Sequence, residues 1–464
     1  MFQLKQALSD SSVFLKEKFK SLHLPDDDSF FELKKIFNTL INKADPLAIL
    51  QPSDLLEASK TINEDSLKKI PILMRSGGHS YAGFCTGPGL VIDSRKLKKI
   101  ECNQNSVILG SGLMLKEAQD TLKKKNYTFA SGEFPGVGLA GYMLGGGHSK
   151  RSRYLGLGAD SVKSMSVLLA SGERLKEVSP YRYRDLFWAL LGGGGGNFAF
   201  VESFEIEKIP SFQDYFFKFT FPASLVNQSN DILRFWENQI QKDPDHIGVN
   251  TTLYIQNGYI TKLIVSGVIM DVNNNIEELD RAFMNNEWYE LSKMKPTKFE
   301  SKITDSNFIR RSNMKNLYFM GTSHYADRNI GSDGFGQLKE SIKHYTKDSN
   351  LYMGLYSMGG KINSPERSIS YPHRQAKYMV DIFSNFREDK TKHELFRSNF
   401  INLQRSLNPI FSGRGYINYP NIDLNENWPA RYYGESLDKL IKVKKKYDPE
   451  NRLDFGEHCI SRLV

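Results

Sequence analysis

Seven consecutive residues, Arg75-Ser76-Gly77-Gly78-His79-Ser80-Tyr81, combine a nucleophilic side chain with a turn that can hold an anion. Paired glycines adopt backbone angles closed to other residues, and successive N–H groups of such a turn form a concave nest for phosphate oxygens. An apolar run precedes the turn at 70–74, and a second run follows it at 87–93. The segment therefore predicts a strand, a phosphate-binding loop and a strand, as a flavin nucleotide requires, with the His79 imidazole inside the turn.

A second glycine-rich stretch contains a literal G-x-G-x-x-G from Gly136 to Gly141, and Asp160 follows about 20 residues later. In a dinucleotide-binding fold this motif needs a buried strand before it and a long helix after it. Here Phe134-Pro135 precedes the motif, and the glycines 145–147 would end a helix after one turn. We therefore interpret residues 132–148 as one loop that wraps a flavin, and not as an NAD site.

Several segments of the chain resemble, in order, those of the berberine bridge enzyme-like oxidases, within the vanillyl-alcohol oxidase superfamily. The segments are the His79 turn, the wrapping loop with Ser152 to Val162 after it, Leu190 to Val201, Tyr416 to Asp423, Trp428, Tyr432 to Glu435, and Tyr447 to Leu453. The resemblance covers about residues 37–460. It is patchy over 211–410, where it is found mainly at Gly359-Gly360 and Tyr371 to Arg374.

The resemblance implies that FAD is the cofactor and that His79 is bonded to its 8α-methyl group. Many relatives form a second bond to flavin C6 through a cysteine, and Phe134 stands in that place. Because a phenyl ring cannot form a thioether, we expect covalent FAD linked through His79 only. Besides His79, Phe134 and Val137, the residues predicted to bind the cofactor are Arg75, Ser76, Gly77, Gly78, Ser80, Gly136, Gly138, Gly141, Tyr142, Gly145, Gly146, Gly147, Asp160, Val162, Asn197, Val201, Asn418 and Asn451.

Val137 bears on the electron acceptor. In relatives that react readily with oxygen this position holds a small branched residue, and in dehydrogenase-like relatives it holds a bulkier one. A valine leaves room for oxygen near flavin C4a, which favours an oxidase over a dehydrogenase on side-chain size alone.

Tyr419 is the expected catalytic base. When a hydride leaves a substrate C–H bond for flavin N5, the adjacent O–H or N–H must lose its proton to a positioned base. Sugar-oxidising relatives use the tyrosine of an Asn-Tyr pair, which matches Asn418-Tyr419. A phenol with an ordinary pKa of about 10 needs a cationic neighbour or hydrogen-bond donors to act as phenolate. The alternative is a packed ring whose hydroxyl is satisfied.

Other side chains are weaker candidates for a role in the site. His148 either lies near the cofactor or contacts pyrophosphate or solvent, and His373 is expected to brace a domain interface together with Arg374. The remaining candidates, which would face the flavin from a sheet, are Tyr254, Tyr325 and Lys361.

The elements that must position these residues predict an α+β fold of two parts. The expected organisation is an N-terminal helical appendage over 1–36, a two-part FAD-binding domain over 37–210, a substrate domain over 211–410, and a C-terminal segment over 411–464 that returns to the FAD-binding domain. The substrate domain is expected to be an antiparallel sheet backed by helices. Its β-branched and aromatic runs predict strands at 215–221, 251–255 and 262–269.

Helices are expected on both sides of this boundary. Residues 53–63 have helical spacing with Ser53 as the N-cap, after a strand within 44–52. In the substrate domain the predicted helices lie near 224–242, 276–293, 333–347 and 374–407.

Composition excludes several classes of function. The chain has 464 residues and a net charge of +9, but its 62 basic residues are offset by 53 acidic ones, which argues against nucleic-acid binding. Its apolar runs are shorter than the roughly 18 to 20 residues of a membrane span. Three cysteines without C-x-x-C spacing indicate a reducing compartment, and no metal-binding pattern occurs. With no secretory signal at the N-terminus, we expect a cytoplasmic location.

Together these features predict an FAD-dependent oxidase that acts on a small-molecule alcohol or sugar and reduces oxygen to hydrogen peroxide. Two alternatives stay open. One is a flavin dehydrogenase that passes electrons to an acceptor other than oxygen. The other is a flavin-binding interaction protein without catalytic activity.

Overall fold

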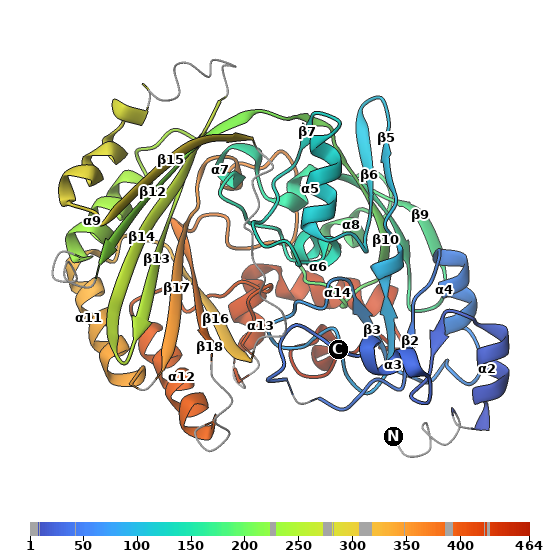
Figure 1. Ribbon diagram of the computed structural model, residues 1–464. Helices are drawn as coiled ribbons and strands as arrows, with labels where there is room; N and C mark the ends of the chain where they lie inside the picture. Colours follow the sequence, from blue (N-terminus) through green and yellow to red (C-terminus); the bar gives the residue numbers. More distant parts are fainter. Residues whose placement is uncertain are drawn as a thin grey trace.

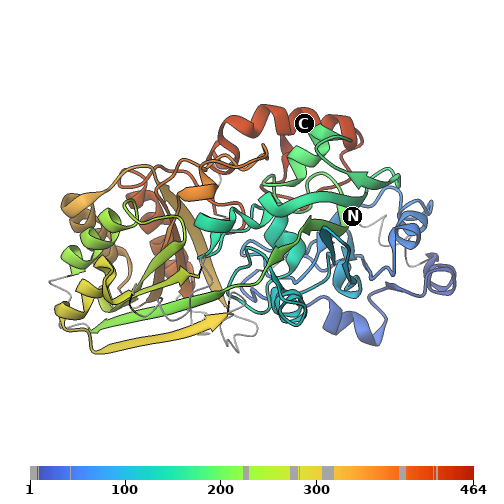
Figure 2. The same ribbon diagram turned by 90° about the horizontal axis from the view of Figure 1, so that it is seen from above.

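The computed structural model describes residues 8, 10–41, 43–222, 229–271, 281, 283–305, 318–347, 349–385, 393–421, 423–424 and 427–464. Their helices and sheets form two lobes that lie side by side (Figure 1, Figure 2). One lobe contains the first and the last described segments of the chain, and the other contains its middle part. The mixed content of helices and sheets confirms the predicted α+β class.

A four-stranded sheet in the order β1-β2-β4-β3 begins the first lobe. β2, β4 and β3 are parallel, and all four residues of β4 are buried, as is typical of parallel sheets. The predicted strand, loop and strand around His79 are confirmed as β3, the loop and β4. The elements are α2 (Ser12–Lys18), β1 (Leu22–His23), α3 (Asp28–Leu33), β2 (Ala48–Leu50), α4 (Leu55–Ile62), β3 (Ile72–Arg75) and β4 (Leu90–Asp93).

A five-stranded antiparallel sheet, in the order β5-β6-β10-β8-β9, completes the strand framework of this lobe, and β7 and β11 form a separate pair. The short helix α6 follows the G-x-G-x-x-G run directly. The elements are η1 (Ser94–Lys96), β5 (Ile100–Cys102), β6 (Ser106–Gly110), α5 (Leu115–Lys123), β7 (Tyr127–Thr128), α6 (Leu139–Leu144), α7 (Ser152–Leu155), η2 (Gly158–Ser161), β8 (Val162–Leu168), β9 (Arg174–Val178), α8 (Arg184–Leu190), β10 (Phe200–Glu207) and β11 (Ile209–Pro210).

The C-terminal segment packs back onto this first lobe through a buried lysine. Lys444, which is fully buried, donates to the backbone oxygens of Asn197 at 2.9 Å and Leu453 at 2.7 Å, and it pairs with Asp448 at 2.7 Å. Leu453 also forms a parallel bridge with Ile72 of β3. The elements are α13 (Trp428–Tyr433), η7 (Gly434–Ser436), α14 (Leu437–Tyr447) and η8 (Ile460–Leu463).

The second lobe is a seven-stranded antiparallel sheet in the order β15-β12-β14-β13-β17-β18-β16. Helices α9, α11 and α12 cover its outer face, and its inner face is turned toward the first lobe (Figure 1). The elements are β12 (Gln213–Pro222), α9 (Ser229–Gln239), β13 (Ile247–Gln256), β14 (Tyr259–Met270), η4 (Glu287–Met294), β15 (Lys298–Asp305), β16 (Phe319–Ala326), α11 (Gly331–Tyr345), β17 (Asn350–Ser357), η5 (Gly360–Ile362), β18 (Tyr378–Asn385) and α12 (His393–Leu407).

The strands predicted at 215–221, 251–255 and 262–269 are confirmed as parts of β12, β13 and β14. The helices predicted near 224–242 and 333–347 are confirmed as α9 and α11, although 223–228 lies outside the described residues. The domain boundaries near 36, 210 and 410 stay predictions.

Two predicted helices are correct only in part, and one predicted N-cap is wrong. The helix predicted over 374–407 is two elements, because Tyr378–Asn385 pairs with both β16 and β17 as a central strand, and only α12 is helical. The helix predicted at 276–293 is confirmed at Arg281, Phe283 and Met284, whereas Glu287–Met294 is a 3₁₀ helix; 276–280 and 282 lie outside the described residues. The N-cap of α4 is Asp54, whose carboxylate accepts from Glu57 N at 2.8 Å, one residue later than the predicted cap Ser53.

The register of the central strands brings distant residues into rows on the inner face. Gly354 of β17 lies opposite Thr252 of β13 and Asp381 of β18, and Asp381 lies opposite Ser323 of β16. The Tyr356 side chain lies directly over Gly354, because a Cβ on Gly354 would lie 2.6 Å from the Tyr356 hydroxyl. The row thus presents a carboxylate at the junction of the lobes.

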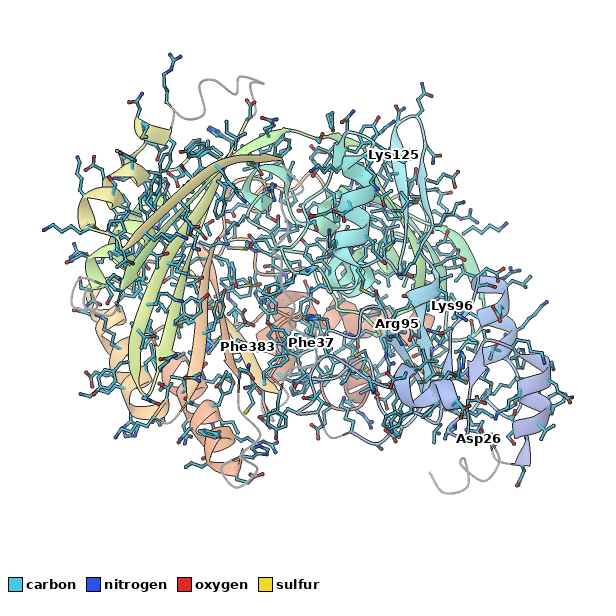
Figure 3. All side chains as sticks on the ribbon, in the orientation of Figure 1. Asp26, Phe37, Arg95, Lys96, Lys125 and Phe383 are labelled. Atoms are coloured by element: carbon cyan, nitrogen blue, oxygen red, sulfur yellow. The ribbon has the colours of Figure 1, made fainter. Side chains whose placement is uncertain are left out.

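Aromatic rings fill part of that junction. Phe37 from the first lobe and Phe383 from the sheet both lie there (Figure 3). Phe319 joins them, with ring centroids 5.7 Å from Phe37 and 4.5 Å from Phe383.

Candidate functional site

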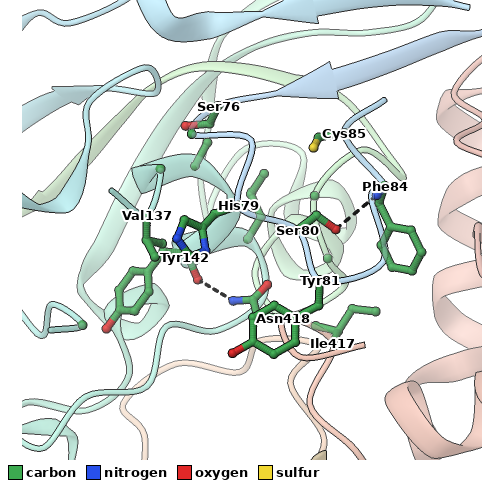
Figure 4. A pocket seen from close by; sticks show the side chains of 18 of the residues that line it. Ser76, His79, Ser80, Tyr81, Phe84, Cys85, Val137, Tyr142, Ile417 and Asn418 are labelled. Atoms are coloured by element: carbon green, nitrogen blue, oxygen red, sulfur yellow. Dashed lines mark hydrogen bonds between the residues drawn. The ribbon is translucent and has the colours of Figure 1, made fainter. Parts of the chain in front are cut away.

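One large cavity lies where the glycine loops of the first lobe meet the inner face of the sheet. It holds about 1590 Å³ of unfilled space, part of it open to solvent. Four segments contribute most of its wall: the His79 turn, the wrapping loop, the glycine run before β10, and residues 416–420 from the C-terminal segment. Segments separated by more than half the chain therefore build a single site (Figure 4).

His79 lies in the cavity wall at the end of the β3 strand and loop (Figure 4). Gly78 has φ +69°, a conformation that only glycine adopts without strain, and it allows the turn. The imidazole stacks on Phe37 with ring centroids 3.6 Å apart. Burial lowers the pKa of His79 to about 4, so the ring is neutral at pH 7 and a ring nitrogen keeps a lone pair for nucleophilic attack.

Arg75 lines the cavity, but its guanidinium braces the turn. It donates to the backbone oxygen of Cys85 at 3.1 Å and to that of Leu33, and it lies 3.9 Å from the buried carboxylate of Asp93. Ser76 likewise donates to the backbone oxygen of Ser111 at 2.8 Å. These side chains hold the loop in place, which leaves the backbone of the turn to face the cavity.

The His79 turn and the wrapping loop touch through two glycines. A Cβ on Gly77 would lie 2.4 Å from Gly138 N, and a Cβ on Gly138 would lie 2.1 Å from Gly77 N. α6, which begins after Gly138, has six residues and ends at Gly145. The motif is therefore not followed by the long helix of a dinucleotide-binding fold, which agrees with the interpretation as a wrapping loop.

Two glycines in the cavity wall leave room for a bound group. Gly141 and Gly195 both line it, yet a Cβ on Gly141 would meet no protein atom within 4 Å, and one on Gly195 would meet only a Leu144 methyl group at 3.7 Å. Side chains at these positions would project into the unfilled space. The glycines therefore keep room for a bound group that the protein itself does not fill.

Most of the predicted cofactor residues come together in this wall. They are Arg75, Ser76, Gly77, Gly78, His79, Ser80, Phe134, Val137, Gly138, Gly141, Tyr142, Asn197, Val201 and Asn418. Asn418 donates to the backbone oxygen of Tyr142 at 3.2 Å, which ties the C-terminal segment to the wrapping loop (Figure 4).

Seven predicted cofactor residues lie outside the lining: Gly136, Gly145, Gly146, Gly147, Asp160, Val162 and Asn451. The carboxylate of Asp160 is engaged by Arg374 at 2.6 Å, and Asn451 donates to the Ser461 backbone oxygen at 2.7 Å. The Gly147 N–H donates to the Tyr416 hydroxyl at 2.9 Å. These residues support the wall from behind.

Tyr419 lies at the end of the cavity nearest the sheet. Its ring stacks on Tyr81 at 5.1 Å, and Ser323 of β16 donates to its backbone oxygen at 3.2 Å. Burial first, and then the nearby Asp381 carboxyl and the Tyr416 phenol, hold the pKa of Tyr419 well above its usual 10. The phenol is therefore protonated at neutral pH. A phenolate would need a cationic neighbour that lowers its pKa, whereas Asp381 raises the pKa of Tyr419.

Asp381 is the acidic group that sequence reasoning missed. It is 4 % exposed, its Oδ1 has no hydrogen-bond partner within the described protein, and burial raises its pKa to about 8. Its charge also acts on Tyr81 and Tyr356. A carboxylate alone in the apolar run Tyr-Met-Val-Asp-Ile-Phe was the available signal, but the segment was predicted as a helix.

The lining also contains residues that the sequence did not single out, and His148, which was only a weaker candidate. An ion pair of Lys150 with Glu133 lines the cavity beside Asn250 and Tyr356. His148 also lines it, donates from Nε2 to the Ser357 backbone oxygen at 3.2 Å, and has its pKa lowered to about 4 by burial.

The remaining candidates lie outside the lining. The Tyr325 hydroxyl forms a hydrogen bond with the Tyr371 hydroxyl at 2.6 Å. Tyr254 packs against Tyr352 at 5.7 Å, Lys361 lies over the Tyr154 ring, and His373 is fully buried beside Tyr325. Arg374 of the middle part of the chain, paired with Asp160, joins the two lobes.

The part of the chain that the structure describes contains no group of three or more histidine, cysteine, aspartate or glutamate side chains that could hold a metal ion. Among the same residues, every helix is too short or too polar to cross a membrane.

Comparisons with known proteins agree with the site. An FAD binding domain model matches residues 46–177, and a model described as berberine and berberine like matches residues 415–455. An uncharacterized FAD-linked oxidoreductase of Bacillus subtilis, YgaK, is 26% identical over 442 residues, which cover 93% of this chain and 95% of that protein. Monolignol oxidoreductase AtBBE-like 13 of Arabidopsis thaliana is 23% identical over 82% of this chain and 78% of its own length.

Solved structures share the fold. Berberine bridge enzyme from Eschscholzia californica superposes with a TM-score of 0.81 at 20% identity, over 99% of both chains. Chitooligosaccharide oxidase gives a TM-score of 0.81 at 19% identity, over 96% of this chain and 98% of that one. The two family models and the relatives over almost the whole chain together support a berberine bridge enzyme-like FAD-linked oxidoreductase, and the solved structures share its fold.

Proposed function

We propose that the protein is an FAD-dependent oxidase that removes a hydride from an alcohol or sugar carbon and reduces oxygen to hydrogen peroxide. The observation that carries the proposal is a neutral imidazole, His79, in the wall of a cavity whose open glycine positions leave room for a flavin. FAD supplies the redox chemistry when it is bound, because it accepts the hydride and passes the electrons on.

His79 holds the cofactor by a single covalent bond. Its neutral form is the nucleophilic one, and its stacking on Phe37 fixes the direction of the ring. Phe134, which lines the cavity where a second link would form, offers only a phenyl ring. Acid precipitation of the purified protein tests this proposal. Yellow colour in the pellet supports a covalent flavin, and colour in the supernatant contradicts it.

Tyr419 and Asp381 together accept the substrate proton. A phenol with a raised pKa is protonated at neutral pH and cannot accept a proton by itself. Its oxygen can accept the substrate proton if the phenol gives its own proton to a carboxylate at the same time. The Asp381 carboxyl is buried, lacks a partner at Oδ1 and interacts electrostatically with Tyr419. Proton removal through this pair favours substrates whose reacting carbon bears O–H or N–H.

Oxygen is the acceptor that the cavity favours. Val137 lines it with a short branched side chain, which leaves more room than a longer aliphatic residue would. A flavin dehydrogenase is the rival, and the fold accommodates both, since solved neighbours include chitooligosaccharide oxidase and a variant of Phl p 4 that is a glucose dehydrogenase. Anaerobic reduction by substrate followed by mixing with oxygen separates them. Reoxidation no faster than that of free flavin would contradict the oxidase.

A sugar or oligosaccharide is the first substrate class, and a secondary-metabolite alcohol is the second. A flavin-binding interaction protein without activity is the rival from another class. A bound flavin that no sugar, alcohol or amine can bleach would support that rival. We also propose a cytoplasmic location, which is supported by cysteines 85, 102 and 459 being free thiols.

A further inference from the structure

We infer that the edge strand β15 binds the same strand of a second copy of the protein, so that two sheets join into one across a twofold axis at Ser301. This interaction goes beyond the proposed function and does not depend on it. β15 is the end strand of the seven-stranded sheet, and it pairs with β12 along its whole length. Figure 2 shows β15, in yellow, at the outer margin of the second lobe. Among the residues that the structure describes, no strand lies beside its other edge.

The opposite edge of the sheet, β16, is closed by other parts of the chain. Asn38 donates to the Phe319 backbone oxygen at 3.1 Å, and the Ser412 N–H donates to the Tyr325 backbone oxygen at 2.8 Å. Every residue of β16 is buried. Residues 298–303 of β15, by contrast, are exposed or half-buried. An exposed edge strand presents backbone N–H and C=O groups that the strand of another chain can pair with.

The apolar core of the second lobe reaches this edge without being covered there. Phe299 and Ile303 are 38% and 44% exposed, and they share one face of β15 because side chains alternate along a strand. The Phe299 ring stacks on the buried ring of Phe219 with centroids 4.7 Å apart. Ile303 lies opposite the buried Tyr215 in the strand register. A further strand beside β15 would therefore cover two side chains that continue the core.

The sequence of β15 fits an antiparallel copy of itself in one register. In a twofold pair, residues directly opposite one another point to the same face of the joined sheet. With Ser301 on the axis, Phe299 lies opposite the second copy's Ile303, and Glu300 lies opposite the second copy's Lys302. The other register of equal overlap has Lys302 on the axis and sets two lysines opposite each other, which is destabilising. Charge complementarity therefore favours a second copy with Ser301 at the centre.

The charged side chains set the register and contribute little of the affinity. Glu300 already pairs with Lys218 at 3.0 Å and with Lys298 at 2.9 Å, and it keeps both partners when the second copy's Lys302 joins them. Ion pairs at a surface contribute little free energy, because water screens them. The affinity must come instead from the backbone hydrogen bonds of the new strand pair and from burial of Phe299 and Ile303.

Sedimentation velocity of the full, flavin-loaded chain tests the inference. From about 1 to about 100 µM protein, we expect a species of twice the 53.0 kDa mass of one chain to become dominant. Lys302→Glu sets glutamates opposite each other in both symmetric pairs, and Glu300→Lys does the same with lysines. Each should raise the dissociation constant of the dimer about tenfold or more. Lys343→Glu, an equal charge change at an exposed position of α11, is the control and should leave the dimer unaltered.

Two further measurements report on the register itself. In an equal mixture of Lys302→Glu and Glu300→Lys, every opposed pair of one mixed dimer is again of opposite charge, so mixing should restore the dimer that each variant alone has lost. Local damage to the strand would not be repaired by mixing. Ser301→Cys brings two thiols together on the axis, because opposite residues of antiparallel strands have Cα atoms close enough for a disulfide. Oxidation should give a cross-linked dimer on a non-reducing gel, and Lys343→Cys should give none.

Two outcomes would overturn the inference. One is a protein that stays monomeric at about 100 µM. The other is a dimer that Lys302→Glu does not weaken and Ser301→Cys does not cross-link, which would reject β15 as the interface. Residues 298–305 lie outside the cavity lining, so flavin binding and flavin reduction should be the same in all these variants. Failure of the proposed function would therefore leave this test unaffected.

Discussion

The two walls of the cavity are encoded in different ways. On the cofactor side, contiguous glycines shape backbone turns, so the chemistry is visible as motifs around His79 and Gly138. On the sheet side, Tyr356 and Asn250 line the cavity from two strands, and Asp381 of a third strand acts electrostatically on Tyr356 from outside the lining. These residues come together only through strand register. A site formed by the backbone of contiguous residues can thus be recognised in a sequence. A site formed by side chains from neighbouring strands cannot. Variants on the two walls should therefore fail in different ways.

The largest effect is expected where two backbones touch. In Gly138→Ala the new Cβ would lie 2.1 Å from Gly77 N, and neither backbone can yield without opening the cavity. We expect purified Gly138→Ala to lack flavin, measured as the ratio of visible to ultraviolet absorbance. Gly136→Ala is the control, because its Cβ meets no atom within 4 Å, and it should keep its flavin. A yellow Gly138→Ala protein would show that the close contact between Gly77 and Gly138 is not needed for flavin binding.

The sheet side should fail in chemistry and not in cofactor retention. Tyr419→Phe should slow anaerobic flavin reduction about 10²- to 10⁴-fold, the usual contribution of a general base. Bound flavin should be unchanged, since the ring and its stacking on Tyr81 remain. Stopped-flow reduction measures the first effect, and the absorbance ratio measures the second. Unaltered reduction would remove Tyr419 from the mechanism.

Reduction should also depend on pH through Asp381. Burial raises its pKa from 3.8 to about 8, so the carboxylate form and the reduction rate should grow as pH rises through about 8. Asp381→Asn should remove this rising limb. A pH profile without such a limb in the unaltered protein would contradict the proton-accepting role.

The same group should affect stability with the opposite sign. The folded protein keeps a proton on Asp381 that the unfolded chain releases, so its contribution to stability falls as pH rises between about 4 and 8. Asp381→Asn should therefore raise Tm at pH 8 relative to the unaltered protein and change it less at pH 4. Thermal unfolding at the two pH values measures the difference. An equal shift at both would show that the cause is packing.

On the cofactor side, replacing His79 should remove the covalent bond to FAD but not the binding of FAD. His79→Ala should bind FAD that dissociates on acid precipitation, because the glycine turns still shape the cavity. We expect flavin in the supernatant and a lower flavin reduction potential, measured by dye equilibration. Retention of colour in the pellet would mean that another side chain forms the bond.

The smallest expected effect concerns the electron acceptor. Val137→Leu adds one methylene in the cavity wall and should slow reoxidation by oxygen up to about tenfold, with anaerobic reduction unchanged. Phe134→Leu, in the same loop and also in the lining, serves as the control and should leave reoxidation unaltered. Equal slowing in both variants would assign the effect to the loop as a whole.

Most residues predicted to bind the cofactor lie in one wall of the cavity for a physical reason. Glycine pairs and positive φ angles are local requirements, and most of the residues chosen for the cofactor lie in the lining. The exceptions, such as Asp160, are bound by partners far away in the chain, here Arg374, which local pattern does not reveal. The Lys150 and Glu133 pair was missed for the same reason, because it depends on how the lobes dock at Gly248.

The sheet wall was harder to predict because its strands alternate between an aromatic outer core and a polar inner face. The aromatic run of β12 predicts a strand, which agrees with the structure. The pattern over 374–407 predicts one helix, although Tyr378–Asn385 within it is the strand β18. That single error hid Asp381, since a helix would have placed it among different neighbours. Cross-strand register, which sets Gly354 beside Asp381, has no signal in an isolated sequence.

The buried Lys444 clamp makes the closed cavity depend on a helix outside its wall. Asn418 and Tyr419 complete a cavity begun by His79, and Lys444 of α14 binds the backbones of Asn197 and Leu453. Shortening the chain before α14 would leave the His79 turn and Asn418 in place but remove this clamp. The turns that shape the cavity would then lack the contact that fastens α14 against them.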